Sequence, residues 1–426
     1  MDKRKKLKMR RIALFTLIGI ISIAFYLINV AWISKDQKET VSPESFIKKV
    51  EGDRVGAWTA SMQEPFEDGI SREGFEDQTI RMILHPQTNG DQMRVRLSNT
   101  FGEKPLTIDK VHAAVSKGGA EIDQDTEQKI TFDGKEKVTI PPGEKMFSDP
   151  IPLEVDSEKE IAVSMYVNEK TGPATWHPRS MQTNYISSGD QVSEAEGFTF
   201  ETEEESWFWL ESVDVIADSS VKGALVVVGS SIANGNYSEV NANHRWPDYL
   251  ADRMNSEDPA VKLSVLNAGL SANQLIDSPP EKGENALDRL ERDVFDQTGV
   301  KGILLHMGEN DIRHNPDYSS EKIIDRMKEI IKAAHEKDLK IYGGTLMPFK
   351  GSSMFTETGE KTRQEVNEWI RTSGEFDGVV DFDKAVRDPE EPERFLAEYD
   401  SGDQLHPNDK GYKKMAESVD LSIFEK

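Results

Sequence analysis

The sequence predicts an apolar membrane-spanning segment, then an all-β domain, then an α/β domain with a parallel sheet. Residues 12–33 contain no charged side chain. Between residues 55 and 217, short runs of alternating apolar and polar residues are separated by Gly and Pro. After residue 218, continuous apolar runs alternate with helical patterns. Such patterns are typical of a membrane span, antiparallel strands and a buried parallel sheet, respectively.

Length and charge set limits on the class of protein. The chain has 426 residues, which is enough for two domains with full cores. Its 77 acidic and 52 basic side chains give a net charge of −25, which argues against a general nucleic-acid binder because the phosphate backbone would repel it. The absence of Cys excludes disulfides, thiol nucleophiles and Cys-based zinc sites.

The first eleven residues differ in charge from the rest of the chain. They hold seven basic residues and one Asp, a charge of +6, so the remainder carries −31. Basic residues next to an apolar segment stay on the cytoplasmic side of a membrane. We therefore expect a cytoplasmic segment at 1–11, a transmembrane signal-anchor at 12–33 and a polar stalk at 34–54. This predicts a single-pass protein of the cell membrane whose remaining part is extracellular.

Two other interpretations of residues 12–33 fit the sequence less well. A cleaved signal peptide normally has a shorter apolar region, and no small-x-small cleavage site precedes Lys35. A buried core helix would not explain the flanking basic cluster. Tyr26 and Trp32 lie toward the far end of the segment, where aromatic rings favour the membrane interface. An uncleaved anchor is therefore the favoured interpretation.

Residues 55–217 are expected to form an all-β accessory domain. The runs 79–84 and 92–98 alternate apolar with polar or basic residues, as half-buried antiparallel strands do. Turn signals such as Pro141-Pro142-Gly143 separate the runs. Many short strands at this spacing predict a β-sandwich or jelly roll. Trp176, Trp207 and Trp209 could stack on sugars, but packing in the core is the favoured interpretation.

Residues 218–426 are expected to form the α/β domain. Ala224–Val228 is a continuous apolar run rich in Val, which is typical of a strand buried on both faces. Similar runs follow at 263–266, 302–305, 340–342 and 379–382. Helical patterns lie between them, at 245–254, 286–295 and 320–336. Strands alternating with helices predict a parallel sheet that is covered on both faces.

Side chains that can perform chemistry follow the ends of these strands, where the sites of open α/β sheets form. Three predicted strands lead into polar segments, and a fourth such segment lies near the C-terminus. The four segments are Gly229-Ser230-Ser231-Ile232, Asn267-Ala268-Gly269-Leu270-Ser271, Met307-Gly308-Glu309-Asn310-Asp311 and Asp403-Gln404-Leu405-His406-Pro407. Together they supply a nucleophile, a base with an orienting carboxylate and two candidate oxyanion donors.

These four segments resemble the signature blocks of the SGNH (GDSL-type) hydrolases, a family of esterases and deacetylases with flavodoxin-like architecture. Further similarity, to a subfamily of secreted bacterial enzymes with an N-terminal β-domain, extends over residues 55–420. In the hydrolase part it involves 241–243, 245–248, 290–294 and 308–312. In the β-domain it involves 55–58, 94–102 and 105–108. The resemblance implies an SGNH hydrolase domain preceded by a β-domain.

The resemblance also implies residue roles. Ser231 matches the nucleophile, His406 the general base, and Asp403 the carboxylate that orients the imidazole. The backbone amides of Ser231 and Gly269 and the side-chain amide of Asn310 match the oxyanion hole. One position departs from the family, because Ser230 stands where the first block usually has an Asp that supports the surrounding loops.

The implied activity is hydrolysis of acyl esters through a covalent intermediate on Ser231, with no cofactor and no metal. By the same resemblance the substrate is an O-acetyl group on a polysaccharide, or a small ester, and the N-terminal helix holds the enzyme on the membrane. Two alternatives stay open at this point. One is a short-chain lipase or esterase acting on small or lipid esters. The other is a non-catalytic glycan-binding surface protein with a decayed site, motivated by Ser230.

Overall fold

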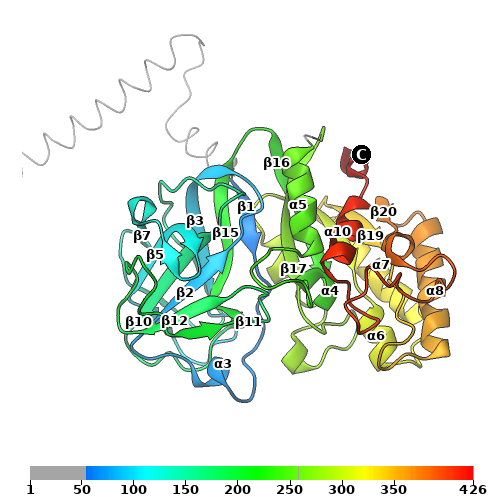
Figure 1. Ribbon diagram of the computed structural model, residues 1–426, viewed down its shortest axis with the longest axis horizontal. Helices are drawn as coiled ribbons and strands as arrows, with labels where there is room; N and C mark the ends of the chain where they lie inside the picture. The colour runs from blue at the N-terminus through cyan, green and yellow to red at the C-terminus, as the bar shows by residue number, and fades with distance from the viewer. Residues whose placement is uncertain (1–53, 258, 426) are drawn as a thin grey trace, which may run out of the picture. The chain divides into compact units, whose positions relative to one another are not determined.

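The computed structural model describes residues 54–257 and 259–425 (Figure 1). These residues belong to one compact unit that begins at Asp53. The predicted cytoplasmic segment, the predicted anchor at 12–33 and nearly all of the predicted stalk lie outside the described residues. Within the described ranges, no helix is both long enough and apolar enough to cross a membrane.

The N-terminal half is β-rich, as expected. One antiparallel sheet has the strand order β1-β15-β3-β9, and a second has the order β13-β12-β2-β10-β5-β6, with β7 also paired to β5. Two short pairs, β11-β14 and β4-β8, complete the region. The bounds are β1 Arg54–Thr59, β2 Gln78–Leu84, β3 Gly90–Ser98, β4 Leu106–Ile108, β5 Lys110–Gly118, β6 Glu121–Ile122, β7 Gln128–Ile130, β8 Val138–Ile140, β9 Lys145–Phe147, β10 Ile161–Val167, β11 Trp176–Pro178, β12 Asn184–Ser188, β13 Thr202–Glu204, β14 Ser206–Phe208 and β15 Leu210–Ala217. The short helix α3 spans Ile70–Glu73.

Residues of the two larger sheets contribute to one hydrophobic core, because alternate side chains of a strand point to the same face. In β2, Ile80, Met82 and Leu84 belong to this core. They meet Val95 and Val213 of the other sheet in the same cluster. The alternation that was visible in the sequence is therefore the alternation that fills this core.

The C-terminal half contains a parallel sheet of order β17-β16-β18-β19-β20. Its strands are β16 Val221–Gly229, β17 Lys262–Gly269, β18 Val300–His306, β19 Lys340–Gly344 and β20 Gly378–Val380. The helices are α4 Ser231–Asn234, α5 Trp246–Ser256, α6 Glu309–His314, α7 Ser320–Glu336, α8 Glu357–Thr372, α9 Phe382–Val386 and α10 Asp409–Glu417. The helix expected at 286–295 is shorter than predicted, since only Glu291–Phe295 form a π-helical turn.

Helices cover both faces of the parallel sheet, and β16 shows how the faces divide. Val226 and Val228 pack in one cluster with apolar residues of α7 and α8. Leu225 and Val227 pack in the opposite cluster with residues of α5 and α10. A central strand buried on both sides reads as a continuous apolar run, which is why Ala224–Val228 has no polar residue.

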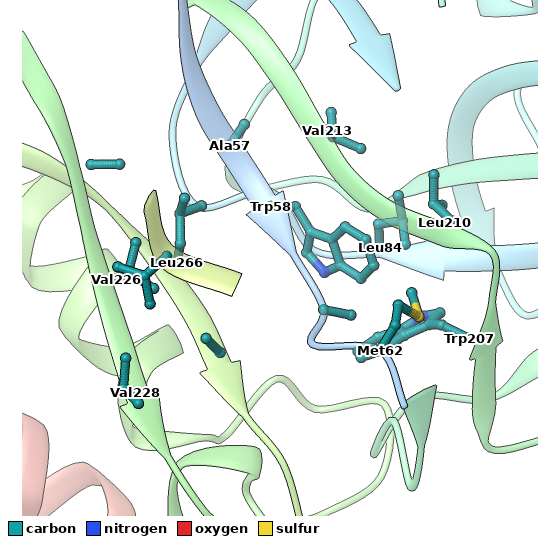
Figure 2. Close-up of a cluster of buried hydrophobic side chains, with 14 of the residues drawn as sticks. Ala57, Trp58, Met62, Leu84, Trp207, Leu210, Val213, Val226, Val228 and Leu266 are labelled. Atoms are coloured by element: carbon teal, nitrogen blue, oxygen red, sulfur yellow. The ribbon is translucent and has the colours of Figure 1, made fainter. Parts of the chain in front are cut away.

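The β-rich half and the α/β half share the first of these clusters (Figure 2). Strand β1 packs against β17, and the hydroxyl of Ser264 donates to the carbonyl of Gly56 at 2.7 Å. A Cβ atom on Gly56 would lie 2.8 Å from Leu266 Cδ1, so a larger residue here would force the Leu266 side chain to move. The two halves are therefore joined by a continuous apolar core.

Candidate active site

Three of the predicted site residues meet at the carboxyl end of the parallel sheet. Ser231 Oγ lies 2.8 Å from His406 Nε2, and His406 Nδ1 lies 2.6 Å from Asp403 Oδ2. Ser231 and His406 are 7% and 8% exposed, and both line one cavity. The structure thus brings together residues that are 175 positions apart in the chain.

The hydrogen bonds determine which ring nitrogen of His406 carries the proton. An ionised carboxylate can only accept, so Nδ1–H donates to Asp403 and a neutral ring leaves Nε2 free to accept from Ser231. Burial alone would raise the pKa of Asp403, but the bonds from the His406 ring and backbone hold it well below its usual range. Asp403 is therefore charged and His406 Nε2 is a base toward the Ser231 hydroxyl.

The turn that carries Ser231 is tight. Strand β16 ends at Gly229 and α4 begins at Ser231, with Ser230 between them. A Cβ atom on Gly229 would lie only 2.2 Å from Ala233 Cβ, so Gly is required for the chain to turn into the helix here. This turn places Ser231 at the rim of the sheet.

Asn310, on α6, is held with its amide group in one orientation. Its Oδ1 accepts from Arg313 Nη1 at 3.2 Å, and its Nδ2 donates to the carbonyl of Asn273 at 3.0 Å. An amide nitrogen has two hydrogens, so the second remains for another acceptor. Asn310 lines the same cavity as Ser231 and His406, as its predicted role requires.

Gly269 does not fit its predicted role. Its N–H donates to Asn267 Oδ1 at 2.9 Å, and it is not among the residues that line the cavity. A Cβ atom at this position would lie 2.4 Å from the amide nitrogen of Asn234. Gly269 is therefore needed for close packing between β17 and α4, and its amide is already occupied.

Ala272, three residues later, lines the cavity instead. Its φ of +63° is in the left-handed region, which Gly adopts freely and Ala rarely does. Within the part of the chain that the structure describes, no acceptor receives the N–H of Ala272 or of Ser231. The sequence did not indicate Ala272 as a backbone donor, because the only glycine of the segment 267–271 is Gly269.

Asp311 fixes the loop that carries Ala272. Its two carboxylate oxygens accept from the backbone N–H groups of Leu275 and Ile276, at 2.8 and 2.9 Å. Burial raises the pKa of Asp311 to about 6, against the opposing effect of these two hydrogen bonds. Helix α6 therefore supplies both Asn310 and the anchor of the neighbouring loop.

Arg289 is the main connection between the loops around the site. Its guanidinium is buried and donates to the carbonyls of Gly229 and Ala268, at 3.0 and 2.9 Å, and to Asn273 Oδ1 at 3.0 Å. It also forms an ion pair with Asp293 at 3.0 Å. These bonds hold the turn before Ser231 and the segment before Ala272 at a fixed separation.

Ser230 occupies the position where an Asp was expected from the resemblance. It is buried, and no side-chain hydrogen bond of Ser230 is found within the described ranges. The loops that the family Asp was expected to support are held here by Arg289. The departure at Ser230 therefore leaves the contact between Ser231 and His406 intact.

A cavity of about 790 Å³ opens beside Ser231 and His406. Both halves of the chain line it, and polar or charged side chains outnumber apolar ones. The β-rich half contributes Gln63, Phe66, Asp68, Gly69, Ile70, Trp176, Pro178, Arg179, Glu204, Glu205 and Ser206. The sequence did not indicate this contribution, because these residues belong to several separate loops and strands.

The tryptophans considered for sugar stacking are packed in the core, as favoured above. Trp176, Trp207 and Trp209 are at most 6% exposed. Trp176 packs edge-on against Phe66, with ring centroids 4.7 Å apart. Of the three, Trp176 lines the β-rich side of the cavity, and it offers no open face.

One group of potential metal ligands lies outside the cavity lining. Ligand atoms of Glu239, His244 and Asp409 lie within 4.8 Å of one another. His244 Nδ1 is 2.7 Å from Asp409 Oδ2, so two of the three already contact each other. The group was not apparent from the sequence because Asp409 is 165 residues from His244.

A serine, a histidine and a charged aspartate in hydrogen-bonded series, beside amide donors in an open cavity, define a serine hydrolase site. Residues 227–414 match the model of the GDSL-like Lipase/Acylhydrolase family, which confirms the resemblance stated from the sequence. No curated protein matches the chain.

Solved structures similar to the chain include three hydrolases. A GDSL-like lipase from Bacteroides thetaiotaomicron is 16% identical, with a TM-score of 0.36, over 47% of this chain and 88% of its own. An aryl esterase from M. smegmatis is 15% identical, with a TM-score of 0.37, and the match covers 45% of this chain and 94% of the esterase. A carbohydrate acetylesterase from Sinorhizobium meliloti is 13% identical, with a TM-score of 0.35, and the match covers 45% of this chain and 94% of the acetylesterase.

Proposed function

We propose that the protein is a membrane-anchored extracytoplasmic serine esterase that hydrolyses O-acetyl esters of polysaccharides. The observation that carries the proposed chemistry is the series of short contacts from Ser231 through His406 to Asp403. A decayed site would have no reason to keep the nucleophile, the base and the orienting carboxylate in hydrogen-bonding geometry.

The reaction follows from these contacts. Ser231 Oγ attacks the ester carbonyl while His406 Nε2 takes its proton, and Asp403 stabilises the imidazolium that forms. The second Nδ2 hydrogen of Asn310 and the unoccupied amides of Ser231 and Ala272 are the donors we assign to the oxyanion. His406 then protonates the leaving alcohol. Water, activated by the same ring, releases the acetate from Ser231.

The cavity favours a hydrophilic alcohol. Its rim carries Asp68, Glu204, Glu205, Glu281 and Lys282, whose side chains would have to lose water to hold a lipid. An acyl tunnel for a long chain would need a mainly apolar lining. The cavity lining therefore favours a carbohydrate acetylesterase over a lipase that acts on long acyl chains.

The test is hydrolysis of p-nitrophenyl acetate by the full chain and by Ser231→Ala. We expect the Ala variant to lose at least three orders of magnitude in kcat, because no other hydroxyl contacts His406 Nε2 within the described ranges. Equal, slow rates for the two proteins would refute the proposal that the protein is an esterase. If the wild type is active, a screen of acetylated polysaccharides for released acetate would identify the glycan.

The membrane anchor rests on the sequence pattern of residues 1–33 alone. It is tested by fractionating cells that express the full chain or a chain lacking residues 2–33. We expect the full chain in the membrane fraction after alkaline carbonate washing, and protease added outside the cells should digest its catalytic part. Release of the full chain by carbonate would contradict the anchor.

A further inference from the structure

Tyr237 presents an aromatic ring at the mouth of the catalytic cavity. Its side chain is 58% exposed, and its ring centroid lies 5.0 Å from that of His406. Its φ of +69° is in the left-handed region, which residues with a Cβ adopt less readily than Gly. The preceding backbone is fixed, since Tyr412 donates its hydroxyl hydrogen to the carbonyl of Asn236 at 2.6 Å. The fold therefore holds an open ring beside the general base.

Arg179, from the β-rich half, lines the same cavity. Its backbone is also left-handed, with a φ of +58°, and its carbonyl accepts from Asn234 Nδ2 at 2.9 Å. Asn234 is the last residue of α4, three positions before Tyr237, so this bond ties the two loops together. The guanidinium is exposed, and among the described residues it has no ion-pair or hydrogen-bond partner. It is a set of donors without an acceptor at the mouth of the site.

The chemistry at His406 indicates which part of a substrate these groups meet. His406 Nε2 returns its proton to the oxygen of the leaving alcohol, so a ring packed on the imidazole borders the alcohol side of the ester. An alcohol that suits both an aromatic face and a fork of N–H donors has an apolar face and several hydroxyls. A pyranose ring has both, with C–H groups on its faces and hydroxyls around its edge.

We propose that Tyr237 and Arg179 form the subsite for the alcohol part of the ester, and that this part is a sugar ring. The ring stacks on Tyr237 while its hydroxyls accept from Arg179. This inference rests on the proposed function and adds the residues that recognise the sugar. It also gives the β-rich half a role in substrate recognition.

The test compares cyclic and acyclic alcohols that carry the same acyl group. The cyclic substrates are mono-O-acetylated methyl gluco-, xylo- and mannopyranosides, and the acyclic one is 2-methoxyethyl acetate. For Tyr237→Ala we expect the ratio of kcat/KM, best pyranoside over acyclic ester, to fall about tenfold. Tyr237→Phe keeps the ring and should keep the ratio within about twofold. Arg179→Gln should lower the ratio by about tenfold as well.

The matched control is Phe198→Ala, which removes an aromatic ring that is 80% exposed and does not line the cavity. We expect it to leave the ratio unchanged. Competitive inhibition by the unacetylated methyl pyranoside provides a second measurement, since its Ki should rise about tenfold in Tyr237→Ala.

Two results would overturn the proposal. If Tyr237→Ala lowers kcat/KM for the pyranoside and for the acyclic ester by the same factor, the ring only positions His406 and binds no sugar. If the wild type shows no preference for any pyranoside over the acyclic ester, the subsite is not for sugars even though the esterase is active. Failure of the proposed function looks different, because the wild type would then hydrolyse neither substrate.

Discussion

Asp403 accepts four hydrogen bonds from its surroundings: two from the ring and backbone of His406, one from the amide of Leu405 and one from the hydroxyl of Ser401. A carboxylate with so many donors is stabilised in its charged form, in agreement with its lowered pKa. The residue therefore links catalysis to stability.

We predict that the stabilising effect of Asp403 depends on pH in one direction. Because its pKa is lower in the folded chain than in the unfolded one, the stabilisation is complete above about pH 4 and is lost as the pH falls further. Denaturant unfolding of the wild type and Asp403→Asn should show a difference in stability that is already complete at pH 7 and shrinks below about pH 4. A difference that grows on acidification would contradict the assignment. The same variant should lose two to four orders of magnitude in kcat.

Asn310 gives a test of the oxyanion donors. Asn310→Ala removes the only side-chain amide in the cavity that is oriented by both Asn273 and Arg313, so kcat on p-nitrophenyl acetate should fall about 10²–10³-fold with KM little changed. Asn315→Ala, at the C-terminal end of α6 and outside the cavity lining, is the matched control. Its kcat should stay within about twofold of the wild-type value. A loss of less than tenfold in Asn310→Ala would remove this residue from the oxyanion hole.

At this scale the sequence predicted side chains better than backbone groups. The sequence shows the side-chain chemistry of Ser231, His406, Asp403 and Asn310, and the structure brings these residues to one cavity. The role predicted for Gly269 depends on a backbone amide, which every residue except Pro possesses. Which amide is unoccupied depends on φ and on neighbouring acceptors, such as Asn267 Oδ1, and neither is encoded in a short motif.

Among the elements, Arg289 holds the ends of β16 and β17 and the loop that follows β17. We predict that Arg289→Met lowers the free energy of unfolding by about 3 kcal/mol, because three buried acceptors and Asp293 lose a charged donor. Arg326→Met is the matched control, because Arg326 pairs with Glu329 at the surface. We expect this substitution to lower the free energy of unfolding by less than about 1 kcal/mol. Equal costs in urea unfolding would show that the network around Arg289 is not needed for stability.

Element prediction succeeded where one periodicity dominated. Ala224–Val228 lies within β16, and the pattern at 320–336 corresponds to α7. The pattern at 286–295 predicted a helix, but only its second half forms a π-helical turn. Arg289 in this stretch donates to the carbonyls of Gly229 and Ala268 and to Asn273 Oδ1, and such tertiary contacts override helical periodicity.

For the molecule as a whole, the boundary expected near residue 218 divides the chain into two kinds of secondary structure that share one core. Hydrophobic periodicity shows that a face is apolar but not which distant segment covers it. The sequence therefore could not show that β1 lies against β17, more than 200 residues later. The same limit hid the β-rich side of the catalytic cavity, which combines residues such as Phe66 and Arg179 with the hydrolase loops.

This shared core predicts that the hydrolase half does not fold alone. A fragment of residues 218–426 would expose the part of β17 around Leu266 that packs against β1 in the cluster of Figure 2. Exposed apolar surface of this kind drives association, so we expect the fragment to aggregate and to lack a cooperative thermal transition. A chain beginning at Asp53 should stay monomeric, melt cooperatively and keep its esterase activity. Size-exclusion chromatography and circular dichroism distinguish the two outcomes, and a monomeric, cooperatively melting fragment would show that the β-rich half contributes only to the cavity.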